Sequence, residues 1–325
     1  MSFVPICGGS PPAVDPLDEA GLRDAMRDRD RATVVAPGVT LGDVLELEER
    51  PPTPPGAVWL SHRTYATAGA SEPSPGLHAY GRADARERRP GVLFLHGGGW
   101  AGGHTAKHVR NANRLAAQGL VTATATYRLS HQAPWPAALE DAKCAVRWMR
   151  ASAPELGLDP DRLVVAGDSA GGHLAAMIAL TPGRFEGSGG HPDHSSAVAG
   201  AFCWYPVTDL RLPGVADSPL VDLTVHFLGA DPQQAVAEAS PISWIHPGAP
   251  PIHSVVGDAD RTTPRAMVAD FHARLDAARV PNRLTVVAGA DHAFDLLPEH
   301  HARCARLLDD LLVDVGVLAL PRSEP

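Results

Sequence analysis

Residues 162–180 read RLVVAGDSAGGHLAAMIAL and change character at Ser169. The run before Ser169 is apolar and β-rich, which favours a strand, whereas the run after it favours a helix. Gly167 and Gly171 lie two positions either side of the serine, where a tight turn has no room for a bulky Cβ atom. This G-x-S-x-G arrangement between a strand and a helix predicts a nucleophile elbow, with the serine hydroxyl exposed at the end of a sheet.

A glycine loop upstream complements this serine. Residues 96–100 read HGGGW and follow the apolar run 92–95. Acyl transfer creates an oxyanion beside the attacking serine, so backbone N–H groups must already point at that oxygen. The alternative is a dinucleotide cradle, because residues 97–102 also fit G-x-G-x-x-G. A dinucleotide site would need an acidic residue about twenty positions further on, and the run 120–127 with Arg128 supplies none, so we favour an oxyanion hole.

Candidate partners of this serine follow two later strands. Asp260 comes after the apolar run 251–256, and His292 comes after the run 283–287. Parallel strands bring their carboxyl ends to one edge of a sheet, so we expect both side chains to meet Ser169 there. His292 would take the serine proton, and Asp260 would fix the imidazole tautomer.

Other side chains compete for these roles. Asp258 lies in the same loop as Asp260, but it still falls in the tight part of the turn after Gly257, so Asp260 is favoured. Two histidine pairs lie in a polar loop and on an expected helix face, and we interpret both as solvated. These pairs are His191 with His194, and His300 with His301.

Apolar runs alternate with helical patterns from about residue 77 onward. This predicts an α/β domain with a mostly parallel central sheet, helices on both faces and a small cap. We assign residues 76–325 to this catalytic domain, with an insertion at 207–247 near the site. Residues 1–75 form an N-terminal extension that is either peripheral or part of the cap. The main expected helices cover residues 105–118, 136–152, 264–279 and 298–315.

Together these motifs resemble the α/β-hydrolases of the esterase and lipase branch. That branch includes hormone-sensitive-lipase-like enzymes, bacterial feruloyl-esterase-like proteins and kynurenine formamidases. The matching stretches lie between about residues 90 and 315, and they read HGGGW, YRLSHQAPWPAALEDAKCAVRWMR, LDPDRLVVAGDSAGGHLAA, PPIHSVVGDADRTTP and VVAGADHAF. The resemblance implies an α/β-hydrolase fold.

The resemblance also implies residue roles. It selects Ser169, Asp260 and His292 as the catalytic triad. His173, where lipase-like members often have Asn, favours the feruloyl-esterase-like side. The backbone N–H groups that the family uses for its oxyanion hole correspond here to those of Gly98, Gly99 and Ala170.

Four aromatic side chains lie near this machinery in the sequence and are candidates for substrate binding. They are Trp100, Trp204, Phe227 and Phe294. Core packing is the alternative for each, because large aromatic side chains ordinarily fill protein interiors. If they line the pocket, they favour an acyl or aryl group of modest size.

The sequence therefore predicts a serine carboxylesterase (EC 3.1.1.-) that cleaves esters of small to medium acyl or aryl groups through an acyl-enzyme. An arylformamidase or amidase would use the same triad on a C–N bond. A non-catalytic, receptor-like binding module on the same fold is the alternative from another class. A peptidase of the prolyl-oligopeptidase type is disfavoured, because these 325 residues leave no room for the large β-propeller of such enzymes.

The amino-acid composition limits the classes of binding partner that we expect. The 325 residues include 28 Lys and Arg against 37 Asp and Glu, a formal charge of −9. This balance provides no broad basic surface for nucleic acid or anionic lipid. No apolar run reaches the ~18 residues of a membrane span, so we expect a cytoplasmic protein with no membrane association. A small-molecule ester is the expected partner, and a homodimer is one alternative for the oligomeric state.

No cofactor or metal is expected. The segment 191–194 offers histidine and carboxylate side chains, but it has no partner cluster at a defined spacing. Four widely separated cysteines form no C-x-x-C pair, and we interpret them as reduced thiols. They are Cys7, Cys144, Cys203 and Cys304.

Overall fold

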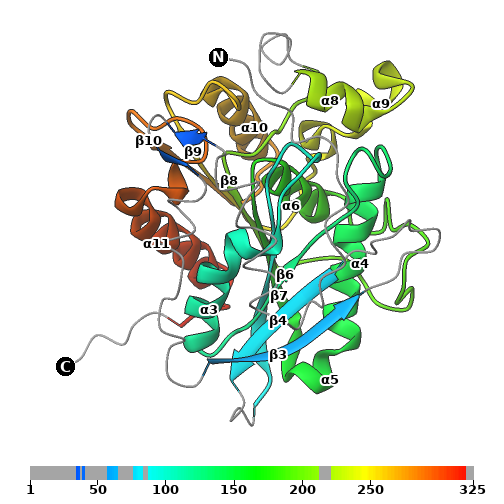
Figure 1. The fold of residues 1–325 in the computed structure, drawn as a ribbon, viewed down its shortest axis with the longest axis vertical. Helices are drawn as coiled ribbons and strands as arrows, with labels where there is room; N and C mark the ends of the chain where they lie inside the picture. The colour runs from blue at the N-terminus through cyan, green and yellow to red at the C-terminus, as the bar shows by residue number, and fades with distance from the viewer. Residues whose placement is uncertain are drawn as a thin grey trace.

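The computed structural model describes residues 34–36, 39–40, 57–64, 76–82, 87–211 and 221–319. Its centre is an eight-stranded sheet in the order β10-β9-β8-β7-β5-β6-β4-β3 (Figure 1). Neighbouring strands from β10 to β6 are parallel, whereas β4 is antiparallel to both β6 and β3. The strands are β3 (Ala57–Thr64), β4 (Gly76–Arg82), β5 (Arg89–Leu95), β6 (Val121–Ala125), β7 (Leu158–Asp168), β8 (Gly200–Trp204), β9 (Ile252–Gly257) and β10 (Asn282–Val287). A separate antiparallel pair consists of β1 (Val34–Ala36) and β2 (Val39–Thr40).

Helices cover both faces of the sheet, so the predicted fold class is confirmed. Helices α3 and α11 lie on one side, and α4, α6 and α10 pack on the other (Figure 1). The α-helices are α3 (Val109–Ala117), α4 (Ala137–Ala151), α5 (Ala153–Leu156), α6 (Ala170–Leu180), α8 (Val221–Leu228), α9 (Pro232–Glu238), α10 (Arg265–Ala277) and α11 (Pro298–Asp314). The described segments also contain the 3-10 helices η1 (Thr105–His108), η2 (Pro241–Trp244) and η3 (Phe294–Leu296).

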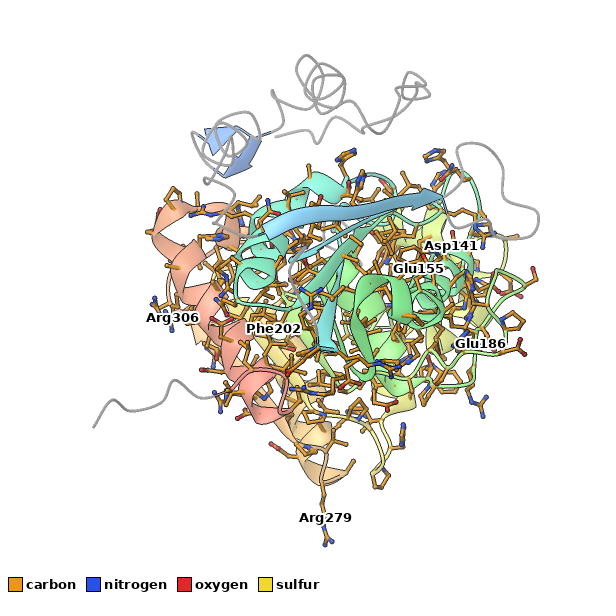
Figure 2. All side chains as sticks on the ribbon, turned by 90° about the horizontal axis from the view of Figure 1, so that it is seen from below. Asp141, Glu155, Glu186, Phe202, Arg279 and Arg306 are labelled. Atoms are coloured by element: carbon orange, nitrogen blue, oxygen red, sulfur yellow. The ribbon has the colours of Figure 1, made fainter. Side chains whose placement is uncertain are left out.

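The burial of strand β5 on both faces of the sheet explains its continuous apolar sequence. Val92 and Phe94 join the hydrophobic cluster that includes α3 and α11, whereas Leu93 and Leu95 join the cluster that includes α4 and α6. Successive side chains of a strand point to opposite faces, and both faces are buried here. Phe202 of β8 lies in this interior, whereas Arg279 and Arg306 extend outward (Figure 2).

The sheet begins before residue 76. Strand β3 falls in the N-terminal extension of the sequence analysis, yet it pairs with β4 at the edge of the sheet. An edge strand has one neighbour and need not be apolar throughout, so the polar residues at 61–64 weaken its signal. Apart from β1, β2 and β3, residues 1–75 lie outside the described residues, so their predicted contribution to a cap stays a prediction. The insertion at 207–247 contributes α8, α9 and η2, which include the uppermost helices of Figure 1.

Three of the four cysteines lie in the described segments. Cys144, Cys203 and Cys304 are buried free thiols, as predicted, and Cys7 lies outside the described residues. Among the helices of the described segments, none has both the length and the apolar character needed to cross a membrane.

Candidate active site

Ser169 lies between β7 and α6, where the sequence places it. Its backbone has φ 49° and ψ −114°, a conformation that a residue with a side chain rarely adopts. The neighbouring chain explains the two glycines. A Cβ atom on Gly171 would lie 2.1 Å from the carbonyl oxygen of Leu95, and one on Gly167 would lie 2.4 Å from the carbonyl oxygen of Gly171. The tight turn therefore depends on both glycines.

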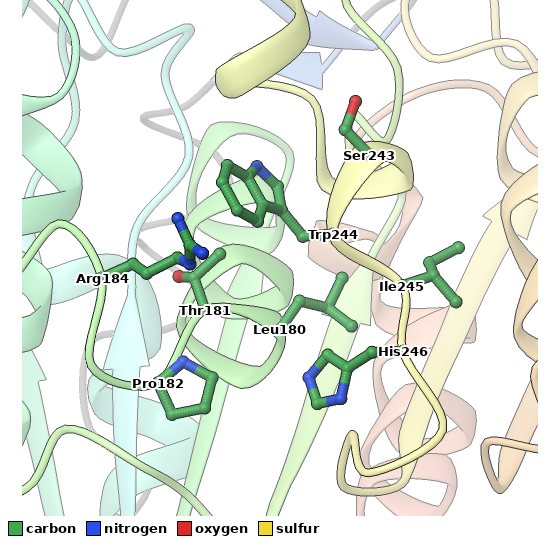
Figure 3. A pocket seen from close by; sticks show the side chains of 8 residues that line it. All are labelled: Leu180, Thr181, Pro182, Arg184, Ser243, Trp244, Ile245 and His246. Carbon is green, nitrogen blue, oxygen red and sulfur yellow. The ribbon is translucent and has the colours of Figure 1, made fainter.

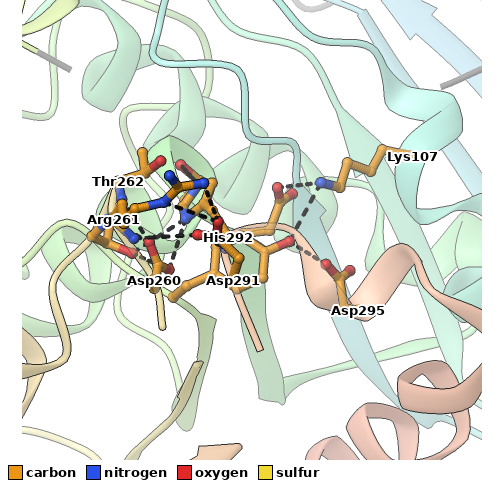
Figure 4. A network of polar contacts seen from close by, with 11 residues as sticks. Lys107, Asp260, Arg261, Thr262, Asp291, His292 and Asp295 are labelled. Atoms are coloured by element: carbon orange, nitrogen blue, oxygen red, sulfur yellow. Dashed lines mark hydrogen bonds and ion pairs between the residues drawn. The ribbon is translucent and has the colours of Figure 1, made fainter. Parts of the chain in front are cut away.

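The side chains of Ser169, His292 and Asp260 form one hydrogen-bonded chain. The Nε2 atom of His292 lies 3.0 Å from Oγ of Ser169, and its Nδ1 atom lies 2.9 Å from Oδ2 of Asp260 (Figure 4). A carboxylate only accepts, so Nδ1 carries the proton and Nε2 is free to accept the serine hydroxyl proton. The structure thus brings together the three side chains that the sequence selects.

Asp260, rather than Asp258, faces the imidazole. The Asp260 carboxylate also accepts the backbone N–H groups of Thr262 and Thr263, at 2.8 and 2.7 Å. Asp258 instead accepts the N–H of Gly289 at 2.7 Å and is exposed. The loop after β9 therefore places the carboxylate of Asp260, and not that of Asp258, against the imidazole of His292.

The glycine loop lies against the elbow. A Cβ on Gly171 would also come within 2.6 Å of the His96 carbonyl oxygen, which shows how closely the two backbones approach. Gly98 and Gly99 have φ values of 115° and 60°, in the region that glycine adopts most readily. Ala170 is the first residue of α6, where a helical N–H has no partner within the helix. The loop and the helix start thus lie side by side, as an oxyanion hole requires.

A buried carboxylate anchors this loop. Asp168 accepts the backbone N–H of Gly97 at 2.8 Å and the Nε2 proton of His108 at 2.9 Å. Its other oxygen lies 2.6 Å from Nζ of Lys107. Burial alone would raise the pKa of Asp168, but Lys107 and His108 lower that pKa below its usual range, so the carboxylate stays ionised. Sequence reasoning missed this cluster, although Asp168 directly precedes Ser169.

Tyr205 is a second group that the sequence analysis missed. Its ring packs against the imidazole of His292, with centroids 4.5 Å apart. Its hydroxyl donates to Asp295, and Lys107 Nζ lies 3.5 Å from the same hydroxyl oxygen (Figure 4). Burial, followed by Asp295, raises the pKa of Tyr205 well above its usual value. Its position directly after β8, at the same sheet edge as the triad, is the signal that could have found it.

The four predicted substrate-binding aromatics are buried, and none is more than 2% exposed. Trp100 stacks on Phe227 with ring centroids 4.3 Å apart. Trp204 packs against Phe202, and Phe294 packs against Tyr205. All four side chains therefore pack in the interior, which was the alternative in the sequence analysis. Pocket lining stays a prediction for each of them.

The insertion reaches this loop through α8. A Cβ on Gly99 would lie 2.5 Å from Cδ1 of Leu223, so α8 lies against the glycine loop. A separate cavity of about 400 Å³ lies beside Leu180 and Trp244, at the far end of α6 from Ser169 (Figure 3). The 11 residues of α6 span roughly 16 Å. This cavity is therefore not part of the triad site.

Comparison with known proteins finds similar esterases. A family model described as BD-FAE matches residues 77–275. The chain is 30% identical over 266 residues to the esterase LipQ of Mycobacterium tuberculosis H37Rv, covering 77% of this chain and 63% of LipQ. It is 30% identical over 300 residues to the esterase LipC of the same strain, covering 86% of this chain and 73% of LipC.

The solved structures that resemble this chain include forms of one esterase. The chain matches esterase 2 of Thermogutta terrifontis phosphonylated by sarin, with a TM-score of 0.72 and 30% identity, over 84% of this chain and all of that one. The propionate-bound form of that esterase matches with a TM-score of 0.70 and 32% identity, over 83% of this chain and 98% of that one.

Proposed function

Since this chain belongs to the BD-FAE family and to the α/β-hydrolase esterases, we propose that it cleaves carboxylic esters with Ser169 as nucleophile. The observation that carries the proposal is the hydrogen-bonded chain from Ser169 through His292 to Asp260. An imidazole with Nδ1 protonated and Nε2 facing a hydroxyl is the arrangement that activates a serine.

The reaction follows from these contacts. His292 Nε2 takes the hydroxyl proton as Oγ of Ser169 bonds to the ester carbonyl carbon, and Asp260 stabilises the imidazolium that forms. Backbone N–H groups hold the oxyanion of the tetrahedral intermediate, and they are those of Gly98, Gly99 and Ala170. The bond to the alcohol oxygen then breaks, and His292 gives its proton to that oxygen. Water repeats the sequence on the acyl-enzyme and releases the carboxylic acid.

We infer that the acyl group is of small to medium size. Leu223 of α8 packs against Gly99, which limits the room beside the loop. Esterase 2 of T. terrifontis has been solved with propionate and with butyrate bound, which supports the same size class.

Hydrolysis of p-nitrophenyl acetate, butyrate and octanoate tests the proposal. Replacing Ser169 with Ala should lower kcat at least about 10³-fold, because the nucleophile is lost. Ser243→Ala is the matched control, since this exposed serine lies at the far end of α6 and should keep wild-type rates. Equal activity of Ser169→Ala and wild type would refute the proposal. Faster hydrolysis of N-formylkynurenine than of every ester would assign a formamidase instead.

A further inference from the structure

A buried hydrogen bond joins the glycine loop to the elbow helix. Nε1 of Trp100 donates to Nδ1 of His173 at 3.2 Å, and the two rings meet edge to face with centroids 5.1 Å apart. Both side chains are fully buried. Trp100 directly follows Gly99, and His173 lies in the first turn of α6. The bond therefore connects the two segments that supply the proposed oxyanion donors.

The second ring nitrogen of His173 fixes its tautomer. Nε2 lies 2.7 Å from the carbonyl oxygen of Ala239, which follows α9. A carbonyl oxygen can only accept, so Nε2 carries the proton and the Nδ1 lone pair accepts from Trp100. Burial lowers the pKa of His173 to about 4, although the bond to Ala239 opposes this, so the ring is neutral near pH 7. Both ring nitrogens of His173 thus have a hydrogen-bond partner.

The backbone of Trp100 is held in an unfavourable conformation. Its φ of 57° lies in the left-handed region, which is costly for a residue with a large side chain and must be imposed by the surroundings. The loop is also tied at its other end, where Gly97 donates to Asp168. Asp168 and His173 lie on either side of Ser169, so both ends of the loop are fastened to the elbow.

We propose that His173 is a positioning residue, which accepts the Trp100 indole proton and thereby fixes Gly98 and Gly99 relative to Ala170. The proposal rests on the proposed esterase function. Negative charge develops on the carbonyl oxygen only as Ser169 attacks, so a loosened loop weakens the transition state more than the bound ester. Loss of the bond should therefore lower kcat and leave KM nearly unchanged.

Trp100→Phe tests the hydrogen bond, and Trp135→Phe is its matched control. Trp135 belongs to the same aromatic cluster, with its ring 5.7 Å from that of Phe227. Its indole nitrogen has no hydrogen-bond partner within the described residues. The two substitutions remove the same atoms, but only Trp100→Phe removes a hydrogen bond. We expect kcat for p-nitrophenyl acetate to fall about tenfold in Trp100→Phe and less than about twofold in Trp135→Phe.

A second pair of variants separates positioning from folding. His173→Gln keeps an acceptor and a donor on one amide, so it should retain more of kcat than His173→Ala. The inhibition constant of a trifluoromethyl ketone, whose serine adduct carries an oxyanion, should rise in proportion to the loss of kcat. A purely structural role would lower the melting temperature without raising this constant.

The outcomes are distinguishable. Wild-type protein without Ser169-dependent hydrolysis would overturn the proposed function and this inference together. Active wild-type protein, with Trp100→Phe and Trp135→Phe equal in kcat, would overturn this inference alone. If His173→Ala does not fold, as circular dichroism would show, Trp100→Phe and His173→Gln still decide the question.

Discussion

Hydrogen bonds from its own loop hold the Asp260 carboxylate in addition to its contact with the His292 imidazole. Its Oδ1 atom accepts two backbone N–H groups, and its Oδ2 atom accepts the hydroxyl of Thr263 at 2.8 Å. A carboxylate fixed in this way imposes one tautomer and one orientation on His292. The position of the acidic residue in its loop, rather than its charge alone, therefore matters.

Two acidic residues of the same loop allow a direct test of this point. Asp260→Asn should lower kcat about 10⁴-fold, because the amide no longer holds the imidazole in the reactive tautomer. Asp258→Asn makes the same chemical change two residues away, on an exposed side chain that bonds only Gly289 in the described structure. Steady-state kinetics of the two variants should differ by orders of magnitude. A larger loss in Asp258→Asn would contradict the assignment.

Lys107 compensates the buried charge of Asp168. Replacing Lys107 with Met leaves that carboxylate without its nearest cation, and loss of one partner of a buried pair costs about 3 kcal/mol of unfolding free energy. Urea unfolding at pH 7 measures this change. Arg279→Met, at an exposed position, is the control and should change stability little. Equal unfolding midpoints for the two variants would show that the pair is not needed.

Helix α8 is the element that we expect to limit acyl length. Leu223 faces Gly99, whereas Val225 of the same helix is 51% exposed. Leu223→Ala should raise kcat/KM for p-nitrophenyl octanoate relative to acetate several-fold, because the smaller side chain opens room beside the loop. Val225→Ala should leave that ratio unchanged. An unchanged ratio in Leu223→Ala would place the acyl group elsewhere.

The elements of the sheet and its covering helices are largely predictable from the sequence. Helix α11, expected at 298–315, is Pro298–Asp314, because a helix packed on one face shows its periodicity. Strand β3 was missed because an edge strand needs no continuous apolar run. Ser169, Asp260 and His292 could be selected from the sequence because each follows a strand end, and the structure brings their side chains together. Lys107 and Asp168 lie far apart in the sequence, so only the folded sheet brings them together.

Several histidines are buried in their neutral form in the folded protein. We therefore expect the stability of the whole molecule to fall at acidic pH. Burial is the main cause that lowers the pKa of His96, His173 and His253 to about 4 each. In the unfolded chain the pKa of each of these side chains is about 6.5. Between these values the unfolded state binds more protons, so stability falls as the pH is lowered. The urea midpoint should therefore be lower at pH 5 than at pH 7.

His253→Asn provides the control for that pH dependence. It removes one of the three groups, and its midpoint should change less between pH 7 and pH 5 than that of the wild type. Equal midpoints at both pH values in the wild type would show that these histidines do not contribute.

Covalent labelling tests most directly whether the molecule assembles one reactive serine. Diethyl 4-nitrophenyl phosphate transfers its diethylphosphoryl group to an activated serine and releases 4-nitrophenolate, which absorbs visible light. We predict one equivalent of nitrophenolate per chain and a diethylphosphoryl mass on the peptide that contains Ser169, with labelling strongly slowed in His292→Ala. A label on another residue, or the same labelling rate in His292→Ala, would contradict the account.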